Sequence, residues 1–170
     1  MKAGRWVAPV LAGLVGSLAA REARADTKLA LDLDYAAAVD QGGVDGGAGG
    51  AVRLGQELDL VLVSLTPEIG GSYHSFGGTL DAKIYSGFVG GRLGFGKIIE
   101  PSVFAHIGIG KLTSRLPSDT GPTFDAGLAL DFTLLPILDL GVHGAYHNLV
   151  LDDGENLDWI GVGAHAAIGF

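Results

Sequence analysis

Five histidines and the absence of cysteine define the metal-binding candidates of this chain. His143 and His147 lie four residues apart in the alternating segment GVHGAYHN. In an extended strand both side chains share one face, but a rise of about 3.3 Å per residue puts their backbones about 13 Å apart, too far for one ion. A shared ion would need His106 or His165 at the same height on another strand. The sequence therefore predicts neither a metal site nor a cofactor, and it excludes thiolate chemistry.

An acidic run, DDGENLD at 152–158, is the second candidate for binding an ion. Carboxylate oxygens suit Ca²⁺, but the run departs from the Asp-X-Asp-X-Asp-Gly order and lacks the bidentate Glu at the twelfth position. Acidic runs in loops are commonly just solvated. We therefore expect a solvated surface loop.

The elements that must position these side chains are short segments in which apolar residues alternate with small or polar ones. The final segment, WIGVGAHAAIGF, has the two-residue period of a β-strand. Seven earlier segments share this pattern, and we predict strands at 28–39, 48–58, 60–74, 82–95, 102–112, 123–133, 138–148 and 159–170.

The connections between these predicted strands alternate in kind. Those at 40–47, 74–81, 113–122 and 149–158 are polar and long, and the others are short. Long loops at one end and short turns at the other are expected of an up-and-down barrel. No stretch after residue 25 holds the ~18 uninterrupted apolar residues of a membrane-spanning helix. The predicted fold is therefore an all-β, eight-stranded antiparallel barrel.

The first residues have the features of a signal peptide. Lys2 and Arg5 precede an apolar run at 6–20, and Ala-Arg-Ala at 23–25 fits a small-X-small cleavage site. We therefore assign residues 1–25 to a signal peptide.

The remaining residues, 26–170, form one domain of acidic composition. They keep seven Lys and Arg against eighteen Asp and Glu, a net charge of about −11. Because phosphate binding needs clustered basic side chains, this composition argues against nucleic acid as a partner.

The two faces of the predicted strands differ sharply in polarity. One face is apolar and uncharged, and aromatic residues gather near both ends of the strands. The other face collects charged residues and histidines, the inverse of a soluble lipocalin-like barrel. With the C-terminal aromatic Phe170, this pattern resembles the small eight-stranded outer-membrane β-barrel proteins of Gram-negative bacteria.

The resemblance implies a transmembrane barrel that lies in the outer membrane after removal of the signal peptide. It implies contact with outer-membrane lipids and lipopolysaccharide, whose phosphates the acidic run could reach through divalent ions. It also implies that the barrel-assembly machinery recognises Phe170 as an assembly signal. The expected role is structural, adhesive or surface-interacting, and the partner of the loops stays open.

Charged residues on the inward faces are expected to pair within the lumen. Eight strands enclose too little space for an aqueous channel, and an unpaired charge in such a lumen is costly. Arg53 and Arg92 should therefore each contact several inward carboxylates. The predicted lumen network consists of Asp32, Arg53, Glu57, Glu68, Arg92 and Asp125.

An outer-membrane enzyme that modifies lipid A is the alternative function. Such enzymes use a Ser whose proton a His removes, and His74, Ser72, Ser86 and His147 fall at similar heights near the loops. The adjacent pair His74 and Ser75 cannot serve, because neighbouring side chains in a strand point to opposite faces. We therefore expect no catalytic residues.

Overall fold

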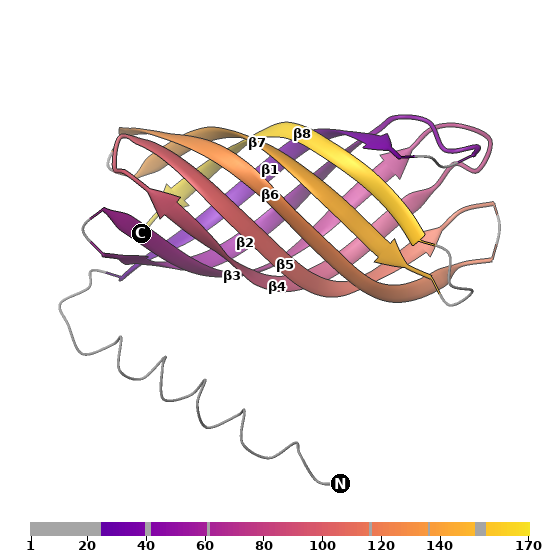
Figure 1. The fold of residues 1–170 in the computed structure, drawn as a ribbon, viewed down its shortest axis with the longest axis horizontal. Coiled ribbons are helices and arrows are strands. Elements are labelled where there is room, and N and C mark those ends of the chain that lie inside the picture. Colours follow the sequence, from indigo (N-terminus) through magenta and orange to yellow (C-terminus); the bar gives the residue numbers. More distant parts are fainter. Residues whose placement is uncertain (1–24, 40–41, 61, 116, 136, 152–155) are drawn as a thin grey trace, which may run out of the picture.

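The protein forms a closed barrel of eight antiparallel strands (Figure 1). A computed structural model describes residues 25–39, 42–60, 62–115, 117–135, 137–151 and 156–170. The signal peptide assigned to residues 1–25 therefore lies almost wholly outside the described residues, as does most of the acidic run. The strands are β1 (Ala25–Ala38), β2 (Gly47–Asp59), β3 (Val63–Phe76), β4 (Lys83–Phe95), β5 (Ile99–Thr113), β6 (Asp119–Leu135), β7 (Leu138–Val150) and β8 (Asn156–Gly169).

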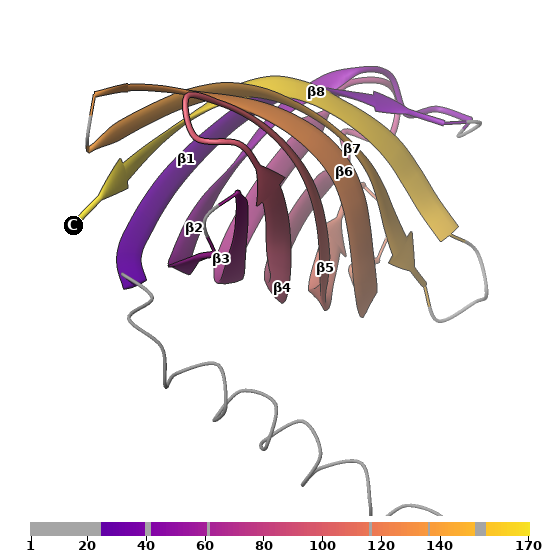
Figure 2. The same cartoon turned by 60° about the vertical axis from the view of Figure 1, so that its left-hand side comes forward.

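Each strand pairs with its neighbours in chain order, and β8 pairs back with β1. The strands run obliquely around the barrel (Figures 1 and 2). At the closing seam, the backbone N–H of Phe170 donates to Thr27 at 3.0 Å, and the N–H of Thr27 donates to Phe170 at 3.1 Å. Closure gives every strand two hydrogen-bonded neighbours, so no sheet edge is left open. The predicted all-β, eight-stranded antiparallel fold is confirmed.

The observed strands are longer than predicted at several ends. β6 begins at Asp119 rather than at residue 123, because Thr120 already pairs with Lys111 of β5. The expected loop at 113–122 is correspondingly shorter. At its start, by contrast, β3 is shorter than predicted, because it begins at Val63 rather than at residue 60. No helix within the described ranges is long and apolar enough to cross a membrane.

The two ends of the barrel differ in their connections. β2 and β3, β4 and β5, and β6 and β7 are joined by two or three residues each at the end that carries Ala25 and Gly169, which we call the terminal end. Connections at 39–46, 77–82, 114–118 and 151–155 lie at the other end, which we call the loop end. This arrangement places the longer connections on one side of the barrel, as the sequence predicts.

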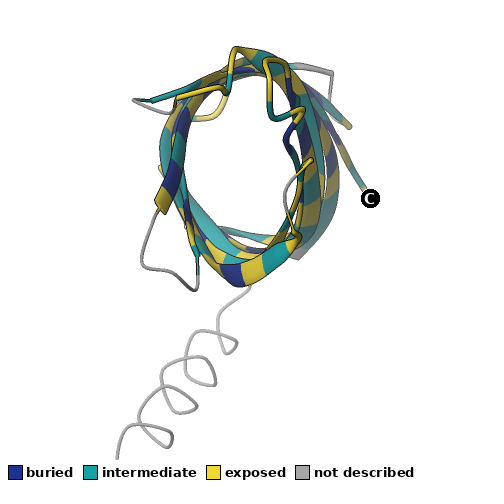
Figure 3. Ribbon diagram, turned by 90° about the vertical axis from the view of Figure 1, so that its right-hand side faces the viewer, coloured by how far each residue is buried: buried dark blue, intermediate teal, exposed yellow. Residues whose placement is uncertain are grey.

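Burial alternates along the strands, which appears as alternating colours in Figure 3. In β1, Leu31 and Leu33 are exposed on the outer surface, whereas Ala30 and Asp32 are buried inside. The exposed apolar residues near mid-strand come from all eight strands and include Leu31, Val52, Ile69, Val89, Ile107, Leu128, Val142 and Val162. The barrel therefore carries its apolar side chains outward.

An apolar cluster fills the interior at the loop end. We call it the apolar plug; it consists of Ala36, Phe76, Ala82, Ile84, Leu149, Leu157 and Trp159. Phe76, Ile84 and Leu149 are at most 1% exposed. The sequence pattern does not predict this plug, because most of these residues lie in or beside segments expected to be loops. They pack together because β3, β7 and β8 extend beyond their predicted ends, so that these side chains still point into the barrel.

Candidate functional site: the barrel interior

Glu68 of β3 is the centre of the charged side chains inside the barrel. Its Oε1 lies 2.6 Å from Nη1 of Arg53 and 3.5 Å from Nε of Arg92, and its Oε2 lies 2.9 Å from Nε2 of His106. The Glu68 side chain is only 5% exposed. Hydrogen bonding to charged partners in such a place is strong because water screens it little.

Each cationic partner of Glu68 also contacts a second carboxylate. Arg53 donates from Nε and Nη2 to the two oxygens of Asp32, at 2.7 and 2.8 Å. Arg92 donates to Asp131 at 3.2 Å and lies over the ring of Phe104. The two parallel hydrogen bonds between Arg53 and Asp32 fix the orientation of the Arg53 guanidinium as well as its position.

The pairing extends through two histidines. Nδ1 of His106 lies 2.6 Å from Oδ1 of Asp125. Nε2 of His165 contacts Oδ1 of Asp131. We call the complete set the interior network; it comprises Asp32, Arg53, Glu68, Arg92, His106, Asp125, Asp131 and His165. Its members come from seven strands, β1 to β6 and β8.

The structure places the predicted lumen residues in contact with one exception. Glu57 contacts neither arginine and pairs instead with Nζ of Lys28, which also donates to Asp139 at 2.7 Å. The reason is distance along the strand: Glu57 lies four residues from Arg53 on β2, about 13 Å toward the terminal end. Lys28 was not among the predicted lumen residues, although it has the same parity as Asp32 on β1.

Two interior cavities lie along this polar interior. The terminal-side cavity has a volume of about 40 Å³ and the loop-side cavity about 50 Å³. A cavity needs only ~10–15 Å³ by this kind of measure to hold one water. Each can therefore hold a few water molecules among the side chains. A larger recess of about 320 Å³ opens at the terminal end, beside Lys28, Glu57 and Asp139.

Negative charge exceeds positive charge around the two interior cavities. Their linings include three basic side chains, Lys28, Arg53 and Arg92, and eight carboxylates, which are Asp32, Asp34, Glu57, Glu68, Glu100, Asp125, Asp131 and Asp139. All five histidines of the chain line one or the other cavity. The interior is therefore an environment that favours added positive charge.

Ser72 and Ser86, the serines considered for lipid chemistry, hydrogen-bond to each other and, within the part of the chain that the structure describes, not to a histidine. Ser72 and Ser86 share a hydrogen bond of 2.6 Å between their hydroxyl oxygens. His74 is 2% exposed, and its Nε2 lies 3.3 Å from Asp34 while its ring meets the indole of Trp159 edge-on. Among the hydrogen bonds of the described residues, none joins a serine to a histidine.

Phe170 lies at the seam where the barrel closes. Its side chain is 74% exposed, and its backbone pairs with Thr27. Recognition of this aromatic by assembly machinery stays a prediction.

Comparison with known proteins identifies the fold. No family model matches the chain, and no curated protein matches it either. The barrel is similar to solved structures of Neisserial surface protein A (NspA), with a TM-score of 0.66 and 14% identity over 85% of this chain and 97% of that one. It is also similar to Ail, the attachment invasion locus protein of Yersinia pestis, with a TM-score of 0.52 and 17% identity over 88% and 100%.

A third similar structure is the N-terminal β-barrel domain of OprF from Pseudomonas aeruginosa, with a TM-score of 0.53 and 13% identity over 86% of this chain and all of that domain. The resemblance inferred from sequence is thus confirmed at the level of fold. The chain has the architecture of the small eight-stranded barrels.

Proposed function

We propose that this chain is an integral outer-membrane barrel with a structural, adhesive or surface-interaction role and an interior filled by side chains, which are polar except in the apolar plug. The observation that carries the proposal is the inverted polarity of the barrel. Charged groups such as Arg53 and Glu68 are buried inside, while Leu33 and Leu128 are about two-thirds exposed outside. Soluble monomers rarely expose apolar patches beyond a few hundred Å², whereas lipid covers such a surface.

The lengths of the strands and the positions of the aromatic side chains support a barrel that spans a membrane. Strands of 13 to 17 residues exceed the ~9–11 residues that a tilted strand needs to cross the hydrocarbon core. Aromatic side chains border the apolar band: Tyr73, Tyr85, Phe124 and Tyr146 toward the loop end, and Phe95, Phe132 and Phe170 toward the terminal end. Aromatic residues favour the boundary between lipid and water.

The surface role rests on two points. The connections at the loop end are the longer ones, as in outer-membrane barrels whose loops face outward. The similar proteins are a surface protein and an attachment invasion locus protein. We infer that residues 1–25 direct export, that Phe170 is read during assembly, and that outer-membrane lipids and lipopolysaccharide surround the barrel.

Membrane insertion is tested by folding the chain into detergent micelles and lipid vesicles. We expect migration on gels that changes after boiling, a β-rich far-UV spectrum, and protection of the strands from protease in vesicles, because a closed barrel satisfies every backbone group without water. Identical migration before and after boiling, together with full solubility of the folded protein without detergent, would contradict the proposal.

The surface role is tested separately by shortening the connections at 39–46 and 77–82 to tight turns. A surface-interaction role predicts that cells carrying the shortened barrel lose attachment to the target surface but keep their resistance to detergent. A structural role predicts the reverse, with detergent resistance depending on the amount of barrel rather than on its loops. The unmodified barrel at matched outer-membrane yield is the control.

A further inference from the structure

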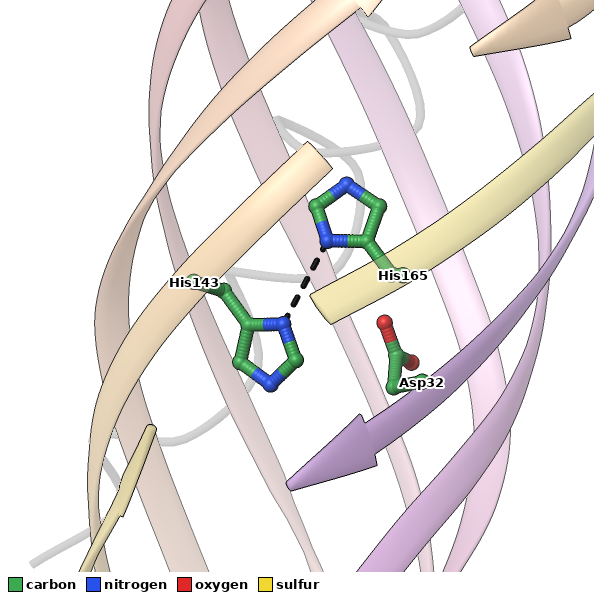
Figure 4. A group of neighbouring side chains, drawn as sticks. All are labelled: Asp32, His143 and His165. Atoms are coloured by element: carbon green, nitrogen blue, oxygen red, sulfur yellow. Dashed lines mark hydrogen bonds between the residues drawn. The ribbon is translucent and has the colours of Figure 1, made fainter. Parts of the chain in front are cut away.

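Three side chains on adjacent strands converge in the interior, as Figure 4 shows. Asp32 of β1, His143 of β7 and His165 of β8 each offer one ligand atom, and these atoms all lie within 4.8 Å of one another. The register explains the convergence. His165 pairs directly with Asp32 on one side and with Gly141, two residues before His143, on the other. On its own strand, His143 has no second histidine close enough to share an ion. His165 of β8 lies beside it and can do so.

The spacing of the two rings suits metal coordination. Nδ1 of His143 and Nδ1 of His165 share a hydrogen bond of 3.3 Å, the dashed line in Figure 4, and an ion between them would take the place of the shared proton. Zinc binds histidine nitrogen at about 2.0–2.1 Å with tetrahedral geometry, which places two ligand nitrogens about 3.3–3.4 Å apart. The two nitrogens thus already have the separation that one tetrahedral ion requires.

The surroundings hold the ligands in place. Nε2 of His165 contacts Asp131, so a proton on Nε2 leaves Nδ1 with its lone pair directed toward His143. Carboxylate support of this kind is usual for histidines that bind metal. Arg53 fixes Asp32 through one hydrogen bond to each oxygen, and each oxygen keeps a further lone pair.

Glycine gives the ring of His165 its space. A Cβ atom at Gly141 would lie 2.5 Å from Nε2 of His165. Only glycine allows the ring to lie against β7 in this orientation. Water can reach the group from the loop-side cavity, whose lining includes Asp32 and His143.

The other histidines do not share these features. Both ring nitrogens of His106 contact carboxylates, Glu68 and Asp125. The ring of His147 stacks on Trp159. Among the described residues, the Asp32, His143 and His165 group is the set of three or more candidate ligands close enough to share an ion. The excess of carboxylates around the cavities further favours a cation there.

We propose that Asp32, His143 and His165 bind one divalent first-row transition ion, best fitted by Zn²⁺, with water from the loop-side cavity completing its coordination. The ligands join β7, β8 and β1, so the ion fastens the barrel across the seam at which it closes. Nitrogen-rich ligands distinguish the site from one for Ca²⁺ or Mg²⁺, which prefer oxygen.

Zinc binding is measured on the folded barrel in detergent, prepared without an oligohistidine tag, by competition with a chromophoric zinc chelator near neutral pH. We expect one Zn²⁺ per barrel. Because loss of a supporting residue alone typically weakens metal binding ~10–100-fold, His143→Gln and His165→Gln should weaken it by more than about 100-fold. Asp131→Asn should weaken it by about 10–100-fold. His147→Gln, on the same face of β7, is the matched control and should leave the affinity unchanged.

Cobalt spectroscopy of the unmodified barrel tests the site without any substitution. We expect the intense visible absorption of tetrahedral Co²⁺, removed by stoichiometric Zn²⁺ but not by Ca²⁺. Absence of zinc binding, unchanged affinity in His143→Gln, or equal loss in His147→Gln would overturn the proposal. So would a cobalt spectrum identical to that of the ion in buffer. Gel migration before and after boiling verifies that each variant is folded, so loss of the barrel itself is distinguished from loss of the site.

Discussion

The apolar plug and the interior network occupy the same barrel but hold it together by different means. Four residues along β1 separate Ala36 of the plug from Asp32 of the network, and six along β8 separate Trp159 from His165. The plug consists of side chains that bury apolar surface at the loop end. The network consists of charges that are stable only as a set. Along β1, β3, β4 and β8, the interior side chains therefore change from charged to apolar toward the loop end, while the outer face stays apolar.

The energetic consequences of this difference are opposite. Burying a large apolar side chain contributes about 1.5–3 kcal/mol wherever it packs, and a slightly smaller side chain loses only part of that. A buried ion pair gains little net energy when complete, because desolvation of both groups offsets their attraction. Removing one member, however, leaves its charged partners short of one opposing charge. The network should thus tolerate change far less than the plug.

The largest expected effect follows from removing the charge of Glu68. Glu68→Gln keeps the size of the side chain but leaves Arg53, Arg92 and His106 short of one negative partner. We expect the free energy of unfolding to fall by about 3–5 kcal/mol, the range for a broken buried pair, because Arg53, Arg92 and His106 all share this one carboxylate. Urea titration in lipid vesicles, followed by tryptophan fluorescence, measures the change.

Glu57→Gln is the matched control for this substitution. Glu57 lies nearer the terminal end, where its side chain is 18% exposed and its partner Lys28 keeps Asp139. Its loss should cost less than about 1 kcal/mol, as for partly exposed pairs. Equal destabilisation by the two substitutions would show that Glu68 has no central place in the interior.

An intermediate effect is expected when a charge is placed on the outer face. Leu128 is 66% exposed near the middle of β6. Leu128→Arg should lower the free energy of unfolding by about 2–4 kcal/mol in a bilayer. The reason is that lipid would surround the new guanidinium, whereas Arg53 and Arg92 are paired with carboxylates. Refolding yields and denaturant midpoints in vesicles report the change. A stability equal to that of the parent would mean that this face does not contact lipid.

The smallest effect is expected in the plug. Ile84 is fully buried there, and Ile84→Val removes one methylene group. The cost should be about 0.5–1.5 kcal/mol, the usual loss for this change in a packed core. The same unfolding assay measures it, and a loss as large as that of Glu68→Gln would remove the distinction between the two regions.

The fold was accessible from sequence because alternation is a local property. The faces of β1 and β8 follow from the parity of residues such as Leu31 and Val162, and each predicted strand is present. The ends of the strands were less accessible. Phe76 and Leu149 lie in segments predicted as loops, where alternation fades, so their inward packing could not be read from the pattern.

The contacts across the interior could be predicted only in part. Parity places Arg53, Glu68 and Arg92 on the inner face, but which of them meet depends on the stagger of the strands around the barrel. Because of this stagger, Glu57 pairs with Lys28, and His165 lies beside His143. A single sequence carries no direct record of such stagger, because each pair joins residues far apart in the chain.

Lipid contact of the outer face is the central claim, and the absence of cysteine allows a direct measurement. Spin labels are attached to single cysteines at Leu128, within the apolar band, and at Lys111, an exposed residue near the loop end of β5, in barrels reconstituted into vesicles. The label at 128 should collide with oxygen, which concentrates in lipid, and hardly at all with a water-soluble nickel chelate. The label at 111 should show the opposite preference. Frequent collision of the label at 128 with the nickel chelate would contradict a barrel that presents its apolar face to a membrane.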